Sequence, residues 1–88
     1  MKIVEGFYLR EIAGETVAVP VGQAAMKYSG LGIMNETGKF IFQLLQTEQT
    51  EESLLKAVTE EFEVDDESAL ADIGEYINTL RNSGVLQE

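Results

Sequence analysis

Four serines, at positions 29, 53, 68 and 83, could act as nucleophiles in catalysis. A lysine lies close to the first of them. Lys27 lies two residues before Ser29, so the two could form a serine–lysine dyad. A serine hydroxyl is a weak nucleophile until a base takes its proton, and the chain has no histidine to do so. No oxyanion-binding signature accompanies the pair either. We therefore interpret Lys27 as an exposed lysine and expect that the chain is not an enzyme.

Metal and cofactor sites find no support in the residue types. The chain has no cysteine and no histidine, which excludes disulfides, zinc–thiolate and iron–sulfur ligation and removes the commonest metal ligand. The acidic run DDESALAD fails as a calcium loop, because a loop that starts at Asp65 has Leu70 at its sixth place, where a glycine is needed. The run SGLGIMNETG lacks the lysine of a phosphate-binding loop and the spacing of a dinucleotide fingerprint. We expect no bound metal and no cofactor.

The charge balance is strongly acidic. Sixteen acids against six bases give a formal charge of −10, which repels nucleic-acid phosphates and anionic membranes. The run MKIVEGFYLR lacks the apolar stretch of a signal peptide, and no segment approaches membrane-spanning length. We therefore expect a cytoplasmic protein that contacts neither membrane nor nucleic acid. The acids crowded between residues 60 and 67 are interpreted as a solvated surface, with attraction of a basic partner as the alternative.

The elements that must position any site begin with strands. Two β-rich stretches, residues 7–12 and 16–21, flank the turn Ala13–Glu15, and its glycine suits a hairpin. The signal weakens over residues 22–30, where a further extended piece is expected, and residues 31–34 read as a short strand.

Three helices are expected after this strand. Asn35, Thr50 and either Asp65 or Asp66 are the expected N-caps. In the first helix Phe42 lies off the apolar stripe, and we expect it to be partly covered. Gly84 should end the third helix as a left-handed cap, with Val85 or Leu86 folding back onto its last turn. The apolar stripe of the third helix comprises Leu70, Ile73, Tyr76, Ile77 and Leu80.

The order of elements predicts an α+β fold. A small sheet beside a three-helix bundle is the winged helix-turn-helix arrangement, here with the sheet first, and all 88 residues are expected to form one domain. Such folds commonly bind DNA through the third helix. This one would be repelled from the groove, because it carries five acids, Asp65, Asp66, Glu67, Asp72 and Glu75, before its first positive residue.

A short glycine-flanked strand favours a different use. An extended peptide can pair with an open sheet edge, while side-chain pockets beside the edge read its sequence. The strand at residues 31–34 could supply that edge, and the third helix could supply the pocket wall. Gly30 and Gly32 would either give the loop a bend or allow a foreign backbone to come close, and the residues leave both interpretations open.

Several stretches together resemble one family. YLREIAGETVAVPVG, then GLGIMNETGKFIFQLL, then an acidic helix, then DIGEYINTLRNSGVL, is similar to the PqqD-like family over about residues 7–86. The resemblance implies a three-stranded N-terminal antiparallel sheet packed on three helices. It also implies a non-catalytic element that binds the leader of a ribosomally made precursor peptide and delivers it to a modifying enzyme, often a radical S-adenosylmethionine (radical SAM) protein.

The resemblance also implies which residues bind the peptide. Carried over by position, the strand edge is Leu31, Gly32, Ile33 and Met34, and the helix wall is Ala69, Asp72, Ile73, Tyr76 and Ile77. Met34 stands where a leucine is common in the family. The alternatives are a winged-helix transcriptional regulator and a non-catalytic scaffold that forms a homodimer through the open edge.

Overall fold

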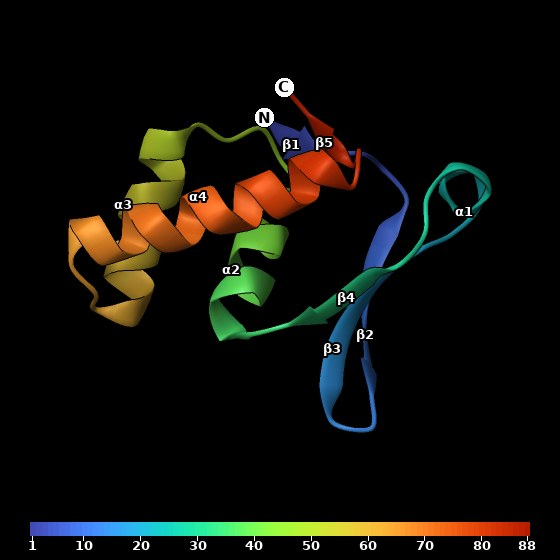
Figure 1. The fold of residues 1–88 in the computed structure, drawn as a ribbon, viewed down its shortest axis with the longest axis horizontal. Helices are drawn as coiled ribbons and strands as arrows, with labels where there is room; N and C mark the ends of the chain where they lie inside the picture. Colours follow the sequence, from blue (N-terminus) through green and yellow to red (C-terminus); the bar gives the residue numbers. More distant parts are fainter.

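The computed structural model describes the backbone of all 88 residues and the side chains of all but Ile33 and Met34. Its strands and helices follow one another along the chain, with a hairpin at the N-terminal end and the longest helices at the C-terminal end (Figure 1). The elements are β1 (Lys2–Ile3), β2 (Phe7–Ile12), β3 (Glu15–Pro20), α1 (Gln23–Lys27), β4 (Leu31–Met34), α2 (Glu36–Leu44), α3 (Glu51–Phe62), α4 (Asp66–Asn82) and β5 (Leu86–Gln87).

The main sheet has the strand order β2-β3-β4 and is antiparallel throughout. The hairpin between β2 and β3 turns at Ala13 and Gly14, both at positive φ (54° and 83°), which is the geometry of a tight primed turn. Strand β4 then pairs with β3 through Ala18–Leu31 and Thr16–Met34. The step of two residues on β3 against three on β4 marks a bulge. The expected fold class, α+β with a three-stranded N-terminal antiparallel sheet, is confirmed.

Two local features differ from the sequence-based expectation. Residues 23–27, expected to be extended, form the short helix α1, which begins after Gly22 at φ 60°. Two alanines give this segment good helix propensity, and Ala24 packs so close to Gly6 that a Cβ at Gly6 would lie 2.7 Å from its own. The second feature is the pairing of β1 with β5, which joins the two ends of the chain and has too few residues for any periodic signal.

Each of the three long helices begins at a capping side chain, and all three expected starts are confirmed. Asn35 Oδ1 accepts from the N–H of Gly38 at 2.7 Å, and Asp65 Oδ1 accepts from Ser68 at 3.0 Å. Thr50 forms a reciprocal capping box with Ser53. These bonds satisfy N–H groups that the first turn of a helix otherwise leaves free. Of the two candidates at the start of α4, Asp65 is the cap.

The core lies between the inner face of the sheet and helices α2, α3 and α4. The expectation for Leu70 is wrong: its side chain is 46 % exposed, and Ala69 takes the buried place. Phe42, expected to be partly covered, is buried at 2 % exposure. The fully buried large side chains are Phe42, Ile41, Leu45, Leu54, Ile73, Leu80, Val58 and Val85.

The end of α4 is a Schellman motif, as the glycine there indicated. Gly84 has φ 76°, its N–H donates to Arg81 O at 3.0 Å, and the N–H of Val85 donates to Leu80 O at 3.3 Å. Val85 is 1 % exposed, so the chain folds back and closes the core at this end.

Replacing either of two glycines in this region by alanine should change the stability of the fold, in opposite directions for the two positions. Gly84→Ala places a Cβ in a left-handed conformation and should lower the free energy of unfolding by about 1 kcal/mol. Gly74→Ala, inside α4 with no atom within 4 Å of the new Cβ, should raise it by about 0.5–1 kcal/mol. Urea unfolding measures both changes. Equal effects of the two substitutions would contradict the assignment of Gly84 as a cap.

Candidate functional site: a groove between β4 and α4

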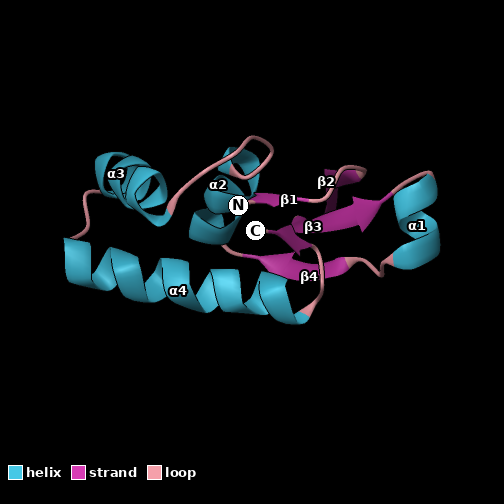
Figure 2. Cartoon of the chain, turned by 90° about the horizontal axis from the view of Figure 1, so that it is seen from above, coloured by secondary structure: helices cyan, strands magenta, loops and turns pink.

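The candidate site is a groove between strand β4 and helix α4, called the β4–α4 groove below. Helix α4 lies alongside β4 on the side away from β3 (Figure 2). Two adjoining hollows of about 320 and 190 Å³ lie along this side of α4. The larger lies between α4 and β4, and the smaller continues between α4 and the start of α2. Both hollows are lined by Asn35, Gly38, Tyr76 and Thr79. The larger adds Gly30, Leu31, Gly32, Leu80 and Ser83, and the smaller adds Thr37, Ile41, Asp72 and Glu75.

The backbone of β4 faces this groove with polar groups. In an antiparallel sheet, the N–H and C=O of successive residues alternate between one neighbouring strand and the other. Val21 N–H donates to Gly6 O at 2.8 Å, so by alternation Val19 and Val17 face β2, whereas Ala18 faces β4. Leu31, the partner of Ala18, therefore directs its backbone bonds toward β3. The bulge between Leu31 and Met34 interrupts this alternation on β4. Because β4 pairs with β3 alone in the main sheet, the backbone groups of this stretch that do not bond to β3 border the free edge.

Glycines keep the groove open. A Cβ at Gly32 would meet no atom within 4 Å, and a Cβ at Gly30 would meet only Ala18 O at 3.4 Å. Gly38 is needed for close packing instead. A Cβ there would lie 3.2 Å from Asn35 Oδ1 and 3.3 Å from Tyr76 Cε1. The absence of a side chain at Gly38 therefore lets the Tyr76 ring lie against the first turn of α2. Tyr76 is half-buried there, and this burial raises the pKa of its phenol.

Comparison with known proteins identifies the relationship. Residues 11–86 match the family described as coenzyme PQQ synthesis protein D (PqqD). This chain belongs to the PqqD family. A search of curated proteins finds no match. Among solved structures, the chain is similar to one described as TbiB1 in complex with the TbiA(beta) leader peptide. The TM-score is 0.72 at 22 % identity, and the match covers 99 % of this chain and 95 % of that one, so the two share a fold.

In this PqqD-family chain, four of the nine residues expected to bind peptide line the β4–α4 groove. They are Leu31, Gly32, Asp72 and Tyr76. Ala69, Ile73 and Ile77 instead belong to the core, with exposed fractions of 0, 2 and 3 %. They support the helix wall from behind and offer almost no surface to a ligand. Ile33 and Met34 belong to β4 by their backbone, and their side chains lie outside the described part of the chain.

The groove also contains residues that the sequence analysis did not assign to peptide binding. Glu75, Thr79 and Ser83 form the exposed part of the helix wall, together with Asp72 and Tyr76. They recur every three or four residues, as one stripe of a helix must. This stripe adjoins the apolar stripe that packs into the core. This regular spacing could have indicated a groove-facing stripe from the sequence. It was not decisive, because polar residues at helical spacing also occur on any solvated helix face.

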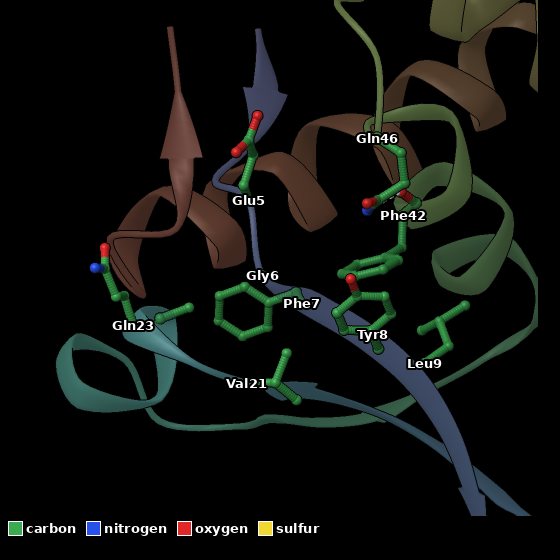
Figure 3. Close-up of a pocket in the computed structure, with 10 residues that line it drawn as sticks. Glu5, Gly6, Phe7, Tyr8, Leu9, Val21, Gln23, Phe42 and Gln46 are labelled. Atoms are coloured by element: carbon green, nitrogen blue, oxygen red, sulfur yellow. Dashed lines mark hydrogen bonds between the residues drawn. The ribbon is translucent and has the colours of Figure 1, made fainter.

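The sheet of this PqqD-family protein has a second free edge, along β2. A hollow of about 670 Å³ lies there, between β2 and the C-terminal part of α2 (Figure 3). On the α2 side it is lined only by Phe42 and Gln46, and Phe42 is itself buried. In the β4–α4 groove Tyr76, Thr79 and Leu80 line the hollow opposite β4, and Asp72 and Glu75 continue the lining past the start of α2. A helix wall therefore runs beside β4 and beside the segment that follows it. That continuous wall makes β4 the stronger candidate edge.

Two further searches bear on the kind of site. Within the described part of the chain, no group of three or more histidines, cysteines or acids is placed to hold a metal ion. None of the described helices combines the length and the apolar character needed to cross a bilayer.

The buried phenol of Tyr76 predicts an alkaline dependence of stability. Its folded-state pKa lies above the ordinary value of 10.0, so the folded state holds this proton more tightly than the unfolded state does. The resulting stabilisation is complete below about pH 10 and is lost as the pH rises further. In urea unfolding between pH 9 and 11, Tyr76→Phe should lose stability less steeply than the unmodified chain. Tyr8→Phe, which removes the phenol of a residue that is 61 % exposed, is the control. Identical slopes for the unmodified chain and Tyr76→Phe would contradict the burial of this phenol.

Proposed function

We propose that this chain binds the leader region of a ribosomally synthesised precursor peptide and presents it to a modifying enzyme. The observation that carries the proposal is the free edge of β4 with the helix wall of α4 beside it. Membership of the PqqD family supports it. The similar structure is TbiB1 with a leader peptide, which supports the same class of ligand.

Binding would occur by strand addition. The peptide backbone would pair with the N–H and C=O groups at the free edge of β4, between Leu31 and Met34, and this pairing is independent of the peptide's sequence. Alternate side chains of the peptide would point toward α4, where Tyr76, together with Leu31 of β4, offers apolar surface. The backbone would thus supply much of the affinity, and the groove would supply the selection.

The chain would act without catalysing a reaction. Its lack of histidine and cysteine supports a role in recognition, with the chemistry performed by a partner enzyme, for which we propose a radical SAM protein. We propose that the whole chain is one recognition domain and that it works in the cytoplasm, where precursor peptides are synthesised. A homodimer through the β4 edge would compete with the peptide for the same backbone groups, so we propose the monomer as the binding form.

An NMR titration tests the binding mode. The probe is a synthetic peptide covering the leader of a candidate precursor peptide, added to ¹⁵N-labelled protein. The amides of residues 31–34 and of the exposed stripe of α4 should shift first. Shifts confined to the β2 edge, at Phe7, Leu9 and Glu11, would contradict the proposal.

A pair of variants separates groove binding from folding. Thr79 lines both hollows of the groove and is exposed, so Thr79→Arg should obstruct the groove and weaken peptide binding by about tenfold or more, while stability changes by less than about 0.5 kcal/mol. Asn78→Arg adds the same side chain to an exposed position of α4 outside the groove and should leave the Kd unchanged. Calorimetric titration measures both. Equal losses for the two variants would exclude the groove as the binding surface.

A further inference from the structure

The β4–α4 groove differs chemically from one end to the other. At the end formed by the C-terminal half of α4 the described lining is uncharged. Its apolar surface comes from Leu31 and Tyr76, because Leu80 behind them is only 1 % exposed. At the other end Asp72 and Glu75 join the lining. Among the described lining residues these two carry the only charges, so the charged end of the groove is wholly negative.

The basic side chains that adjoin groove residues in the sequence are held by acids. Arg81, which follows Leu80, donates to both carboxylate oxygens of Glu88, at 2.9 and 2.8 Å. Lys39 follows Gly38, and its Nζ lies 3.9 Å from Oε1 of Glu11. Because each of these cations already has an acidic partner, neither compensates the two acids of the groove in the part of the chain that the structure describes.

The long-range electrostatic field of the helices is negative, like the charged end of the groove. The first 35 residues hold three acids and three bases, so the whole net charge of −10 comes from residues 36–88, which include α2, α3 and α4. A ligand that enters between the neutral sheet and these helices meets a negative potential on the helix side. Such a field attracts cationic ligands and slows the approach of anionic ones.

We propose that the β4–α4 groove selects a peptide segment with a large apolar side chain and, four residues away, a lysine or arginine. The inference rests on the proposed function and names the chemistry of its ligand. The apolar side chain occupies the larger hollow, against Leu31 and Tyr76. The basic side chain reaches Asp72 and Glu75.

The four-residue spacing follows from geometry. The helix-side lining of the larger hollow runs from Tyr76 to Ser83 and centres near position 80, eight residues from Asp72, which is about 12 Å along α4. Four residues of an extended strand cover about 13 Å. Because side chains of a strand alternate between its two faces, a separation of four also keeps both side chains on the face that meets α4. A separation of three or five would turn the basic side chain away.

Selection from a peptide library tests this pattern and does not require the natural leader to be identified. A displayed library of randomised nonapeptides is selected on the immobilised chain at low salt, with the Thr79→Arg variant as the counter-selection. The consensus should contain a large apolar residue and a lysine or arginine four positions apart. The order of the two residues will report the direction of the bound strand. A consensus that is acidic, or without a charged position, overturns the proposal.

Matched substitutions then assign the charge preference to the groove. In the selected peptide, replacing the basic residue by glutamate should weaken binding about fivefold to tenfold, the size expected for exposed ion pairs with two acids. Moving the basic residue by one position should have a similar effect, and 1 M NaCl should remove the difference. The double variant Asp72→Asn/Glu75→Gln should lose most of the difference between the basic and the glutamate peptides.

The control carries the same change of charge elsewhere on α4. Asp66→Asn/Glu67→Gln removes two acids of the first turn, which do not line the groove, and should keep most of the preference for the basic peptide. Equal losses of preference in the two double variants would overturn the assignment to Asp72 and Glu75. If basic and glutamate peptides bind equally while the amides of residues 31–34 shift, the charge pattern is wrong and strand addition stands. If the shifts lie elsewhere, strand addition itself fails.

Discussion

The fold depends on the requirement that backbone N–H and C=O groups find partners. Strand β4 meets this requirement on one side only, through Ala18–Leu31 and Thr16–Met34. Its other side borders a groove that solvent or a guest strand can fill. The strand ends at Asn35, whose side chain caps α2 and so fixes where the extended backbone stops. The polar groups of the edge are thus held in position by bonds made on the opposite side and at the end of the strand.

Helix α4 serves two purposes with two neighbouring stripes. Ala69, Ile73 and Ile77 pack into the core and hold the helix in place. The adjoining stripe, with Asp72, Tyr76 and Thr79, faces the groove. Because the core stripe sets the rotation of the helix, the groove stripe cannot turn away without loss of core packing. A rigid wall of this kind lets a groove select side chains at small entropic cost.

Tyr76 links the two purposes. Its ring lies against Gly38 at the start of α2, so the groove and the first turn of that helix share one contact. Burial raises the pKa of the phenol and keeps it neutral well above physiological pH. The acids of the groove, Asp72 and Glu75, lie on the N-terminal side of Tyr76 along the same helix. The ring therefore supplies apolar surface directly beside the negative end of the groove.

The features that could be predicted from the sequence are those whose causes are local. Capping residues marked the starts of α2, α3 and α4, a glycine marked the end of α4, and another glycine marked the hairpin. These features follow from bonds within a few residues, so the residue types at a few neighbouring positions are enough to indicate them. The family pattern, confirmed over residues 11–86, supplied the edge strand and the helix beside it.

The face of α4 that borders the groove could be identified only once the helix was packed. Periodicity identified an apolar stripe but placed Leu70 in it, although Ala69 is buried in its stead. Periodicity also could not tell that Ile73 and Ile77 face the core while Thr79 and Ser83 face β4. That distinction depends on the rotation of α4 against α2 and α3. The rotation is set by contacts between residues far apart in the chain, and such contacts leave no periodic trace in the sequence.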